Sequence, residues 1–195
     1  MSRLKNKVKR WLDDQIGQEL LQKLMAVPTR QNEYGYDAFG FNRDEAKVAV
    51  VFTRWLYRYY FRVRTFGVEN IPPGRALIIS NHSGQLPFDG VALGGALIFD
   101  LDPPRIARSM IEHFVPSLPY VSYLFSRWGQ IVGTPENCLR LLRDDEVVVV
   151  FPEGARGVSK PFSQRYKLQS FGHGFMRLVM SSNWRRRNAA AGWKR

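Results

Sequence analysis

The chain has 195 residues, an apolar fraction of 45% and a net charge of +12. This length suits one folded domain with a sizeable core, and the apolar fraction excludes an intrinsically disordered chain. Cys138 is the single cysteine, which excludes an internal disulfide, and no window holds the roughly 20 apolar residues of a membrane-spanning helix.

The positive charge is concentrated in the last part of the chain. From Gly154 onward there are ten Lys and Arg residues and no Asp or Glu. The sequence has no helix-turn-helix, zinc or RNA-recognition motif, so nucleic acid is an unlikely partner. We expect phosphate-bearing substrates or anionic lipid to be the partners of this charge.

Residues 3–26 are predicted to form an amphipathic helix, because apolar side chains recur every three or four residues. Its first turns are basic and carry Arg3, Lys5, Lys7, Lys9 and Arg10. The pattern fits a helix lying in the plane of an anionic membrane. It fits equally a helix packed on the domain with a solvated basic face.

A second helix is predicted at about residues 43–63. Its arginines step by four residues and form one stripe, Arg54, Arg58 and Arg62. Such a stripe fits contact with lipid headgroups, or a plain solvated face, and rules out a simple spanning helix. We expect residues 1–65 to form a helical segment on a membrane surface, with the chain bound peripherally at the cytoplasmic face.

From residue 66 the pattern becomes that of an α/β protein. Apolar runs predict strands at residues 76–80, 105–109, 129–132 and 147–151. Intervening segments predict helices at residues 89–99, 118–127, 135–143 and 171–180. The expected fold is therefore α/β, a mixed sheet flanked by helices over residues 66–180, with amphipathic helices at the N-terminus.

The first strand runs into a histidine, His82, and a short loop containing Gly and Pro then brings Asp89 back toward it. A histidine held by a carboxylate can act as a general base, since the carboxylate fixes the tautomer and leaves the other ring nitrogen free to take a proton. The alternative is that His82 is a polar residue at a strand end and Asp89 caps the following helix.

The last strand ends in Pro152-Glu153-Gly154-Ala155-Arg156-Gly157. Ligands of open α/β sheets bind at the carboxyl ends of the strands, so this segment is a candidate binding loop. The planar guanidinium of Arg156 can clamp a phosphate, and the glycines allow a ligand to approach the backbone.

These two segments, about 70 residues apart, resemble the glycerolipid acyltransferases, the family of lysophosphatidic acid and glycerol-3-phosphate acyltransferases. The resemblance runs from about Tyr34 to Met180. Its three blocks are Asn81-His82 with Asp89, the Gly-rich segment Gly129 to Asn137, and Phe151 to Gly154 with Arg156 behind it.

The resemblance implies transfer of a fatty acyl group from acyl-CoA or an acyl-carrier protein to a hydroxyl of a glycerolipid or lysophospholipid, with no bound cofactor or metal. His82 would be the general base and Asp89 would orient it. The substrate would be held by Glu153, Gly154, Arg156, Gly133 and Thr134.

Two features depart from the family pattern. Six residues separate His82 from Asp89, where many members have four. No apolar strand follows the predicted helix at 171–180, and residues 181–195 form an atypical basic tail. From this pattern we expect a domain truncated at its C-terminus.

Two other functional classes stay open at this point. A serine hydrolase would use Ser80 or Ser83 together with the His–Asp pair. An inactive remnant would bind a membrane or nucleic acid without turnover.

Overall fold

The computed structural model describes residues 2–27, 29–82, 86–164, 167–174, 176 and 177. Its centre is a sheet of four strands, β1 (Ala76–Ile79), β2 (Ala107–Ile111), β3 (Ile131–Val132) and β4 (Val147–Val150). They lie in the order β1-β4-β2-β3. The α/β class is confirmed.

Every strand pairing among the described residues is parallel, so the expectation of a mixed sheet was wrong on this point. The reason is that each connection between consecutive strands contains a helix, which returns the chain to the same edge of the sheet. These connecting helices are α4 (Phe88–Phe99), α5 (Val121–Arg127) and α6 (Pro135–Arg143).

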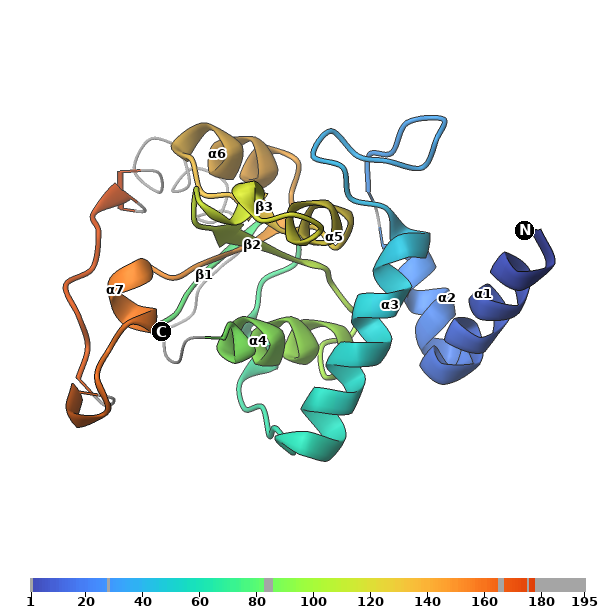
Figure 1. The fold of residues 1–195 in the computed structure, drawn as a ribbon, viewed down its shortest axis with the longest axis horizontal. Coiled ribbons are helices and arrows are strands. Elements are labelled where there is room, and N and C mark those ends of the chain that lie inside the picture. Colours follow the sequence, from blue (N-terminus) through green and yellow to red (C-terminus); the bar gives the residue numbers. More distant parts are fainter. Residues whose placement is uncertain (1, 28, 83–85, 165–166, 175, 178–195) are drawn as a thin grey trace.

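The helices cover both faces of the sheet, with α4 on one face and α5 and α6 on the other (Figure 1). Strand β4 therefore has no exposed face. Val148 and Val150 belong to a core cluster with Leu141 of α6, while Val147 and Val149 belong to the cluster of Leu97 on α4. Burial on both faces explains why β4 is a run of four valines instead of an alternating pattern.

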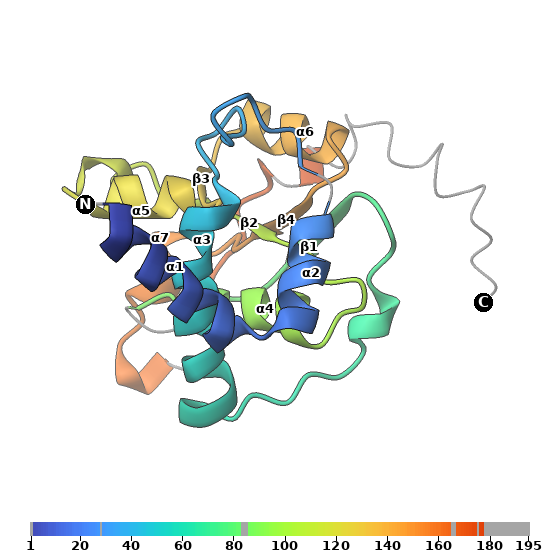
Figure 2. The same ribbon diagram turned by 90° about the vertical axis from the view of Figure 1, so that its right-hand side faces the viewer.

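The predicted helix at 3–26 is in fact two helices, α1 (Ser2–Ile16) and α2 (Gln18–Ala26). They separate at Gly17, whose φ of 84° does not occur inside a right-handed helix. Both pack with α3 (Arg43–Arg54) beside the sheet domain (Figure 2). Their shared core consists of Ile16, Leu24, Val50 and Ile98.

The second predicted helix, at 43–63, changes its geometry after α3. Residues Trp55–Tyr60 form a π-helix, in which the N–H of Phe61 donates to the carbonyl of Leu56, five residues earlier. A π-turn has more residues per turn than an α-turn, so it re-aims the side chains that follow.

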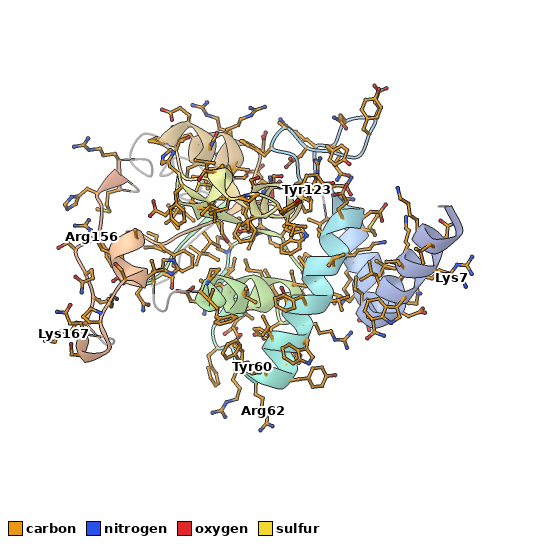
Figure 3. All side chains as sticks on the ribbon, in the orientation of Figure 1. Lys7, Tyr60, Arg62, Tyr123, Arg156 and Lys167 are labelled. Carbon is orange, nitrogen blue, oxygen red and sulfur yellow. The ribbon has the colours of Figure 1, made fainter. Side chains whose placement is uncertain are left out.

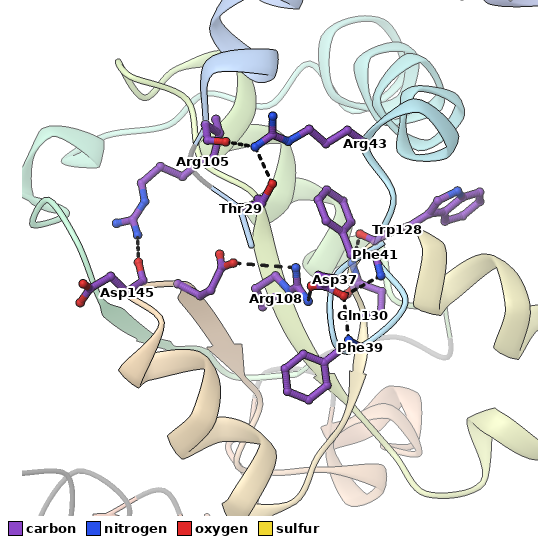
Figure 4. A network of polar contacts seen from close by, with 12 residues as sticks. Thr29, Asp37, Phe39, Phe41, Arg43, Arg105, Arg108, Trp128, Gln130 and Asp145 are labelled. Atoms are coloured by element: carbon purple, nitrogen blue, oxygen red, sulfur yellow. Dashed lines mark hydrogen bonds and ion pairs between the residues drawn. The ribbon is translucent and has the colours of Figure 1, made fainter. Parts of the chain in front are cut away.

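A buried arginine of the sheet forms an ion pair with the loop after α2 (Figure 4). Arg108 of β2 is fully buried, and its guanidinium donates to Asp37 at 2.5 Å. The other carboxylate oxygen of Asp37 accepts from the backbone N–H groups of Phe39 and Phe41, both at 2.8 Å. The buried charge is thus paired, as a charge inside a protein must be.

After β4 the chain forms the short helix α7 (Ala155–Val158). Of the predicted helix at 171–180, residues 175 and 178–180 lie outside the described residues. The N–H groups of Met176 and Arg177 both donate to the carbonyl of His173, as in a helical turn. The basic tail expected at 181–195 also lies outside the described residues.

The packing of α4 on the π-helix yields a stability prediction. A Cβ at Gly95 would lie 2.4 Å from the ring of Tyr57, whereas one at Gly94 would meet only Ala107 at 3.9 Å. We expect Gly95→Ala to lower the free energy of unfolding by about 1–2 kcal/mol, since overpacking outweighs the better helix propensity of Ala.

Gly94→Ala is the matched control, and we expect it to raise the free energy of unfolding by about 0.5–1 kcal/mol. Urea denaturation measures both changes. Equal effects of the two substitutions would contradict the packing described here.

Candidate active site

The ends of β1 and β4 bring two distant segments together. These strands are neighbours, with Ile79 opposite Val150 in the register, and the N–H of Ser80 donates to the carbonyl of Val150 at 3.1 Å. The residues that follow the two strands, His82 and Glu153, therefore meet at the carboxyl edge of the sheet.

His82 and Asp89 form a hydrogen-bonded pair. The Nδ1 atom of His82 lies 2.6 Å from Oδ2 of Asp89, and both side chains are mostly buried. Asp89 also accepts from the N–H of Gly90 at 2.8 Å, and the imidazole stacks on the ring of Phe151 with 4.4 Å between centroids. With the Nδ1 proton held by the carboxylate, Nε2 carries the lone pair that can accept a proton.

Asp89 is not the cap of the following helix. The N-cap of α4 is Pro87, and Asp89 lies in its first turn. Its negative charge there is favourable to the helix, because unsatisfied N–H groups carry partial positive charge at this end. The carboxylate thus stabilises the start of α4 and holds the imidazole at the same time.

Glu153 is buried and holds the backbone of the histidine. Its Oε1 accepts from the N–H of His82 at 3.2 Å, and its Oε2 pairs with Lys160 at 2.5 Å and accepts from the N–H of Gln169 at 3.0 Å. Burial by itself would raise the pKa of this carboxyl group, but the hydrogen bonds from Lys160, Gln169 and His82 outweigh it and lower the pKa. Both oxygens of Glu153 thus bond to groups of the protein itself, and its part in substrate binding stays a prediction.

Two residues to which the sequence analysis gave no part in holding the histidine complete this arrangement. Lys160 donates to the carbonyl of His82 at 3.2 Å, so it bridges the histidine backbone and Glu153. Gly157 lies so close that a Cβ there would be 2.8 Å from the Cβ atoms of both His82 and Glu153. A glycine inside a short helix, one turn after a buried acid, is the signal that could have revealed this contact.

Gly154 and Arg156 lie at the same edge of the sheet as His82. Gly154 has a φ of 55°, and a Cβ there would be 2.8 Å from Oε1 of Glu112. That carboxylate, at the end of β2, accepts from the N–H of Ala155 at 3.0 Å and was also missed by the sequence reasoning. Arg156 is exposed on α7 (Figure 3), and among the described residues no hydrogen bond or ion pair to it is found.

Gly133 and Thr134 lie away from the histidine. They follow β3, which β2 separates from β4, so roughly 10 Å of sheet lies between them and the β4 end. Thr134 caps α6 by accepting from the N–H of Asn137 at 3.2 Å, and Gly133 donates to the carbonyl of Ile111 at 2.9 Å. Each of these two residues thus has a role in the local backbone structure, as a helix cap and in a strand hydrogen bond.

Ser80 does not pair with His82. Its hydroxyl donates to the carbonyl of Asn81 at 3.1 Å, so it is not aligned as the nucleophile of a hydrolase. Ser83, the other candidate, lies outside the described residues. Within the part of the chain that the structure describes, no group of His, Cys, Asp and Glu is arranged to hold a metal ion.

Comparison with known proteins identifies the class. The family described as "Acyltransferase" matches residues 62–186, more than half of the chain, and the chain belongs to this family. The match includes both strand ends that meet at His82. No solved structure matches the chain significantly.

The curated relatives are longer proteins. The chain is 37% identical over 172 residues to an uncharacterized protein of Mycobacterium leprae (strain TN), covering 84% of this chain and 47% of the relative. It is 36% identical over 90 residues to a mouse protein named "DGAT1/2-independent enzyme synthesizing storage lipids", covering 46% of this chain and 26% of that one. The chain thus spans less than half the length of these relatives.

The close approach of Gly157 to His82 predicts a large effect of one methyl group. If His82 is the base of an acyl-transfer reaction, we expect Gly157→Ala to lower its kcat roughly a hundredfold, because the added Cβ would push the imidazole out of position by a fraction of an ångström or more. Gly174→Ala is the control, since a Cβ there meets nothing within 4 Å. Similar rates for the two variants would show that the Gly157 contact does not set the histidine position.

The Glu153–Lys160 pair predicts a pH-dependent stability. We expect Glu153→Gln to lower the free energy of unfolding at neutral pH by about 2 kcal/mol, because it leaves the buried Lys160 without its charged partner while the amide oxygen can still accept a hydrogen bond. Since folding lowers the pKa of Glu153 from its ordinary 4.5, the wild-type advantage is present above that pH and is lost as pH falls through the lowered value.

Urea denaturation between neutral pH and pH 3 measures this difference. The curves of wild type and Glu153→Gln should converge at acid pH. Glu112→Gln serves as a control, because Glu112 is exposed and a neutral amide oxygen can still accept from Ala155. A constant difference at all pH values would contradict the role given to the ion pair.

Proposed function

We propose that this chain transfers a fatty acyl group from an acyl thioester to a hydroxyl group of a lipid, with His82 as the general base. The observation that carries the proposal is the 2.6 Å contact between Nδ1 of His82 and Asp89, which leaves Nε2 as a proton acceptor. It is supported by membership of the acyltransferase family.

The reaction needs no enzyme nucleophile. Nε2 of His82 takes the proton of the acceptor hydroxyl as its oxygen attacks the thioester carbonyl carbon. When the tetrahedral intermediate collapses, the C–S bond breaks and the imidazolium returns the proton to the leaving thiolate. Asp89 stabilises the imidazolium and fixes the ring, and the Glu153–Lys160 pair fixes the backbone that carries it.

The acceptor in this proposal is a glycerolipid or lysophospholipid. A lipid acceptor is supported by the mouse relative, whose name states that it synthesizes storage lipids. We assign Gly154 and Arg156 to substrate binding, because both lie at the strand end beside Glu153 and Arg156 offers its guanidinium to solvent. The phosphates of acyl-CoA or of an acyl-carrier protein are groups that such a cation binds.

A lipid substrate requires contact with a membrane, and we propose that this contact is peripheral and on the cytoplasmic side. None of the helices that the structure describes is long and apolar enough to cross a bilayer. A reducing compartment suits the free thiol of Cys138, which is buried and whose pKa burial raises to about 11.

The central test replaces the base and its partner. We expect His82→Ala to lower turnover by about 10² to 10⁴, the usual contribution of a general base. Asp89→Asn should also lower turnover strongly, since a neutral amide cannot stabilise the imidazolium. The measurement is acyl transfer from acyl-CoA to a lysophospholipid and to a monoacylglycerol, with circular dichroism to verify folding.

Ser80→Ala is the matched control and should transfer acyl groups at the wild-type rate. A serine hydrolase would instead release free fatty acid without an acceptor and lose that activity in the Ser80 variant. Near-normal transfer by a folded His82→Ala protein would refute the mechanism, and no transfer by the wild type would favour a lipid-binding remnant.

A further inference from the structure

An apolar stripe lies exposed along α3 and the π-helix. Val48, Phe52, Trp55 and Tyr59 follow one another at steps of three and four residues, and their exposed fractions lie between 47% and 65%. The opposite side of α3 is buried through Ala46 and Val50. The stripe is therefore not needed for the core of the described domain.

The π-helix turns this stripe into a chain of touching rings. Because its hydrogen bonds join residues five apart, Trp55 and Tyr60 stack, with 5.7 Å between centroids. Tyr60 meets Phe61 edge to face at 4.7 Å, and Phe61 meets Phe88 at 5.1 Å. All four rings remain substantially exposed.

The chain of rings ends at the candidate active site. Phe88 is the first residue of α4 and directly precedes Asp89, which holds His82. We call the exposed side chains of this stripe and ring chain the aromatic surface; it consists of Val48, Phe52, Trp55, Tyr59, Tyr60, Phe61 and Phe88.

The segment that carries most of the aromatic surface is basic. From Ala46 to Val68 the chain has five basic residues and no acidic residue. Arg54 donates to the carbonyl of Gln15 at 2.6 Å, and Arg58, which is exposed, pairs with Asp100 at 2.8 Å. Two of the three arginines of the expected stripe thus also make contacts within the protein, and the contact of the stripe with headgroups stays a prediction.

Arg62 and Arg64, which follow the rings along the chain, are both exposed. Figure 3 places Arg62 beside Tyr60 at the far end of the π-helix, well away from Lys7 on α1. Exposed Trp and Tyr rings flanked by arginines are the side chains that favour the boundary between lipid headgroups and acyl chains.

We propose that the aromatic surface is the face with which this protein rests on an anionic phospholipid bilayer, so that His82 and Asp89 lie at the lipid interface. The inference builds on the proposed function. A bilayer explains the combination of exposed aromatic rings, flanking cations and continuity with the site of a proposed lipid reaction.

The test measures binding to vesicles of phosphatidylcholine and phosphatidylglycerol. We expect the variant Trp55→Ser/Tyr59→Ser/Tyr60→Ser to lose roughly a hundredfold in vesicle affinity, given that each buried aromatic ring contributes strongly to partitioning. Tyr34→Ser/Phe114→Ser, which removes two rings of at least 60% exposure from other parts of the surface, should bind like wild type.

The dependence of vesicle binding on salt concentration distinguishes the electrostatic contribution of the arginines from the apolar contribution of the rings. Arg62→Ala/Arg64→Ala should weaken binding at low salt and have little effect at high salt, where charges are screened. The loss caused by the triple aromatic variant should persist at high salt. Quenching of Trp fluorescence by brominated lipid should fall in Trp55→Phe, which retains an apolar ring.

Two variants test the membrane-docking inference independently of the proposed acyl transfer. His82→Ala should bind vesicles like wild type although it does not turn over. The triple variant should lose transfer to acceptors embedded in vesicles. Unchanged vesicle binding by the folded triple variant would overturn the inference. A dimeric wild type together with a monomeric triple variant would also overturn it, since the aromatic surface would then be the interface between two copies of the chain.

Discussion

A buried carboxylate connects the parts of this site. Glu153, at the end of β4, accepts from the N–H of His82, and its partner Lys160 donates to the carbonyl of the same histidine. A buried charge without a partner is costly, so the position of the histidine is coupled to the segment that carries Lys160. Gly157 permits the approach, because any side chain there would meet both residues.

The parallel sheet makes this contact possible. β4 lies between β1 and β2, so the segments after all three strands meet at one edge and bring His82, Glu153 and Glu112 close together. The helices on both faces bury the central strand, so the residues of the site extend from a fully packed part of the fold. Where α4 begins, Asp89 faces this site and Phe88 faces the aromatic surface, so chemistry and docking share one helix end.

Local patterns were sufficient for most elements of the fold. The apolar runs at 76–80 and 147–151 became β1 and β4 with shifts of one residue at their ends. The break at Gly17 was not foreseen, because the apolar spacing continues across it and only the backbone angle interrupts the helix. The π-helix was not foreseen either, since an α-turn and a π-turn accept the same aromatic sequence.

The sequence by itself determined the α/β class and indicated the pairing of His82 with Asp89, because only six residues separate the two. Only the tertiary structure showed that Glu153 and its partner Lys160 both bond to the backbone of His82. It also showed that Gly157 lies against the histidine and that Arg54 donates to a backbone carbonyl of α1. The physical reason is sequence separation. Lys160 reaches a residue 78 positions away, and that contact depends on which strands are neighbours, which no short segment encodes.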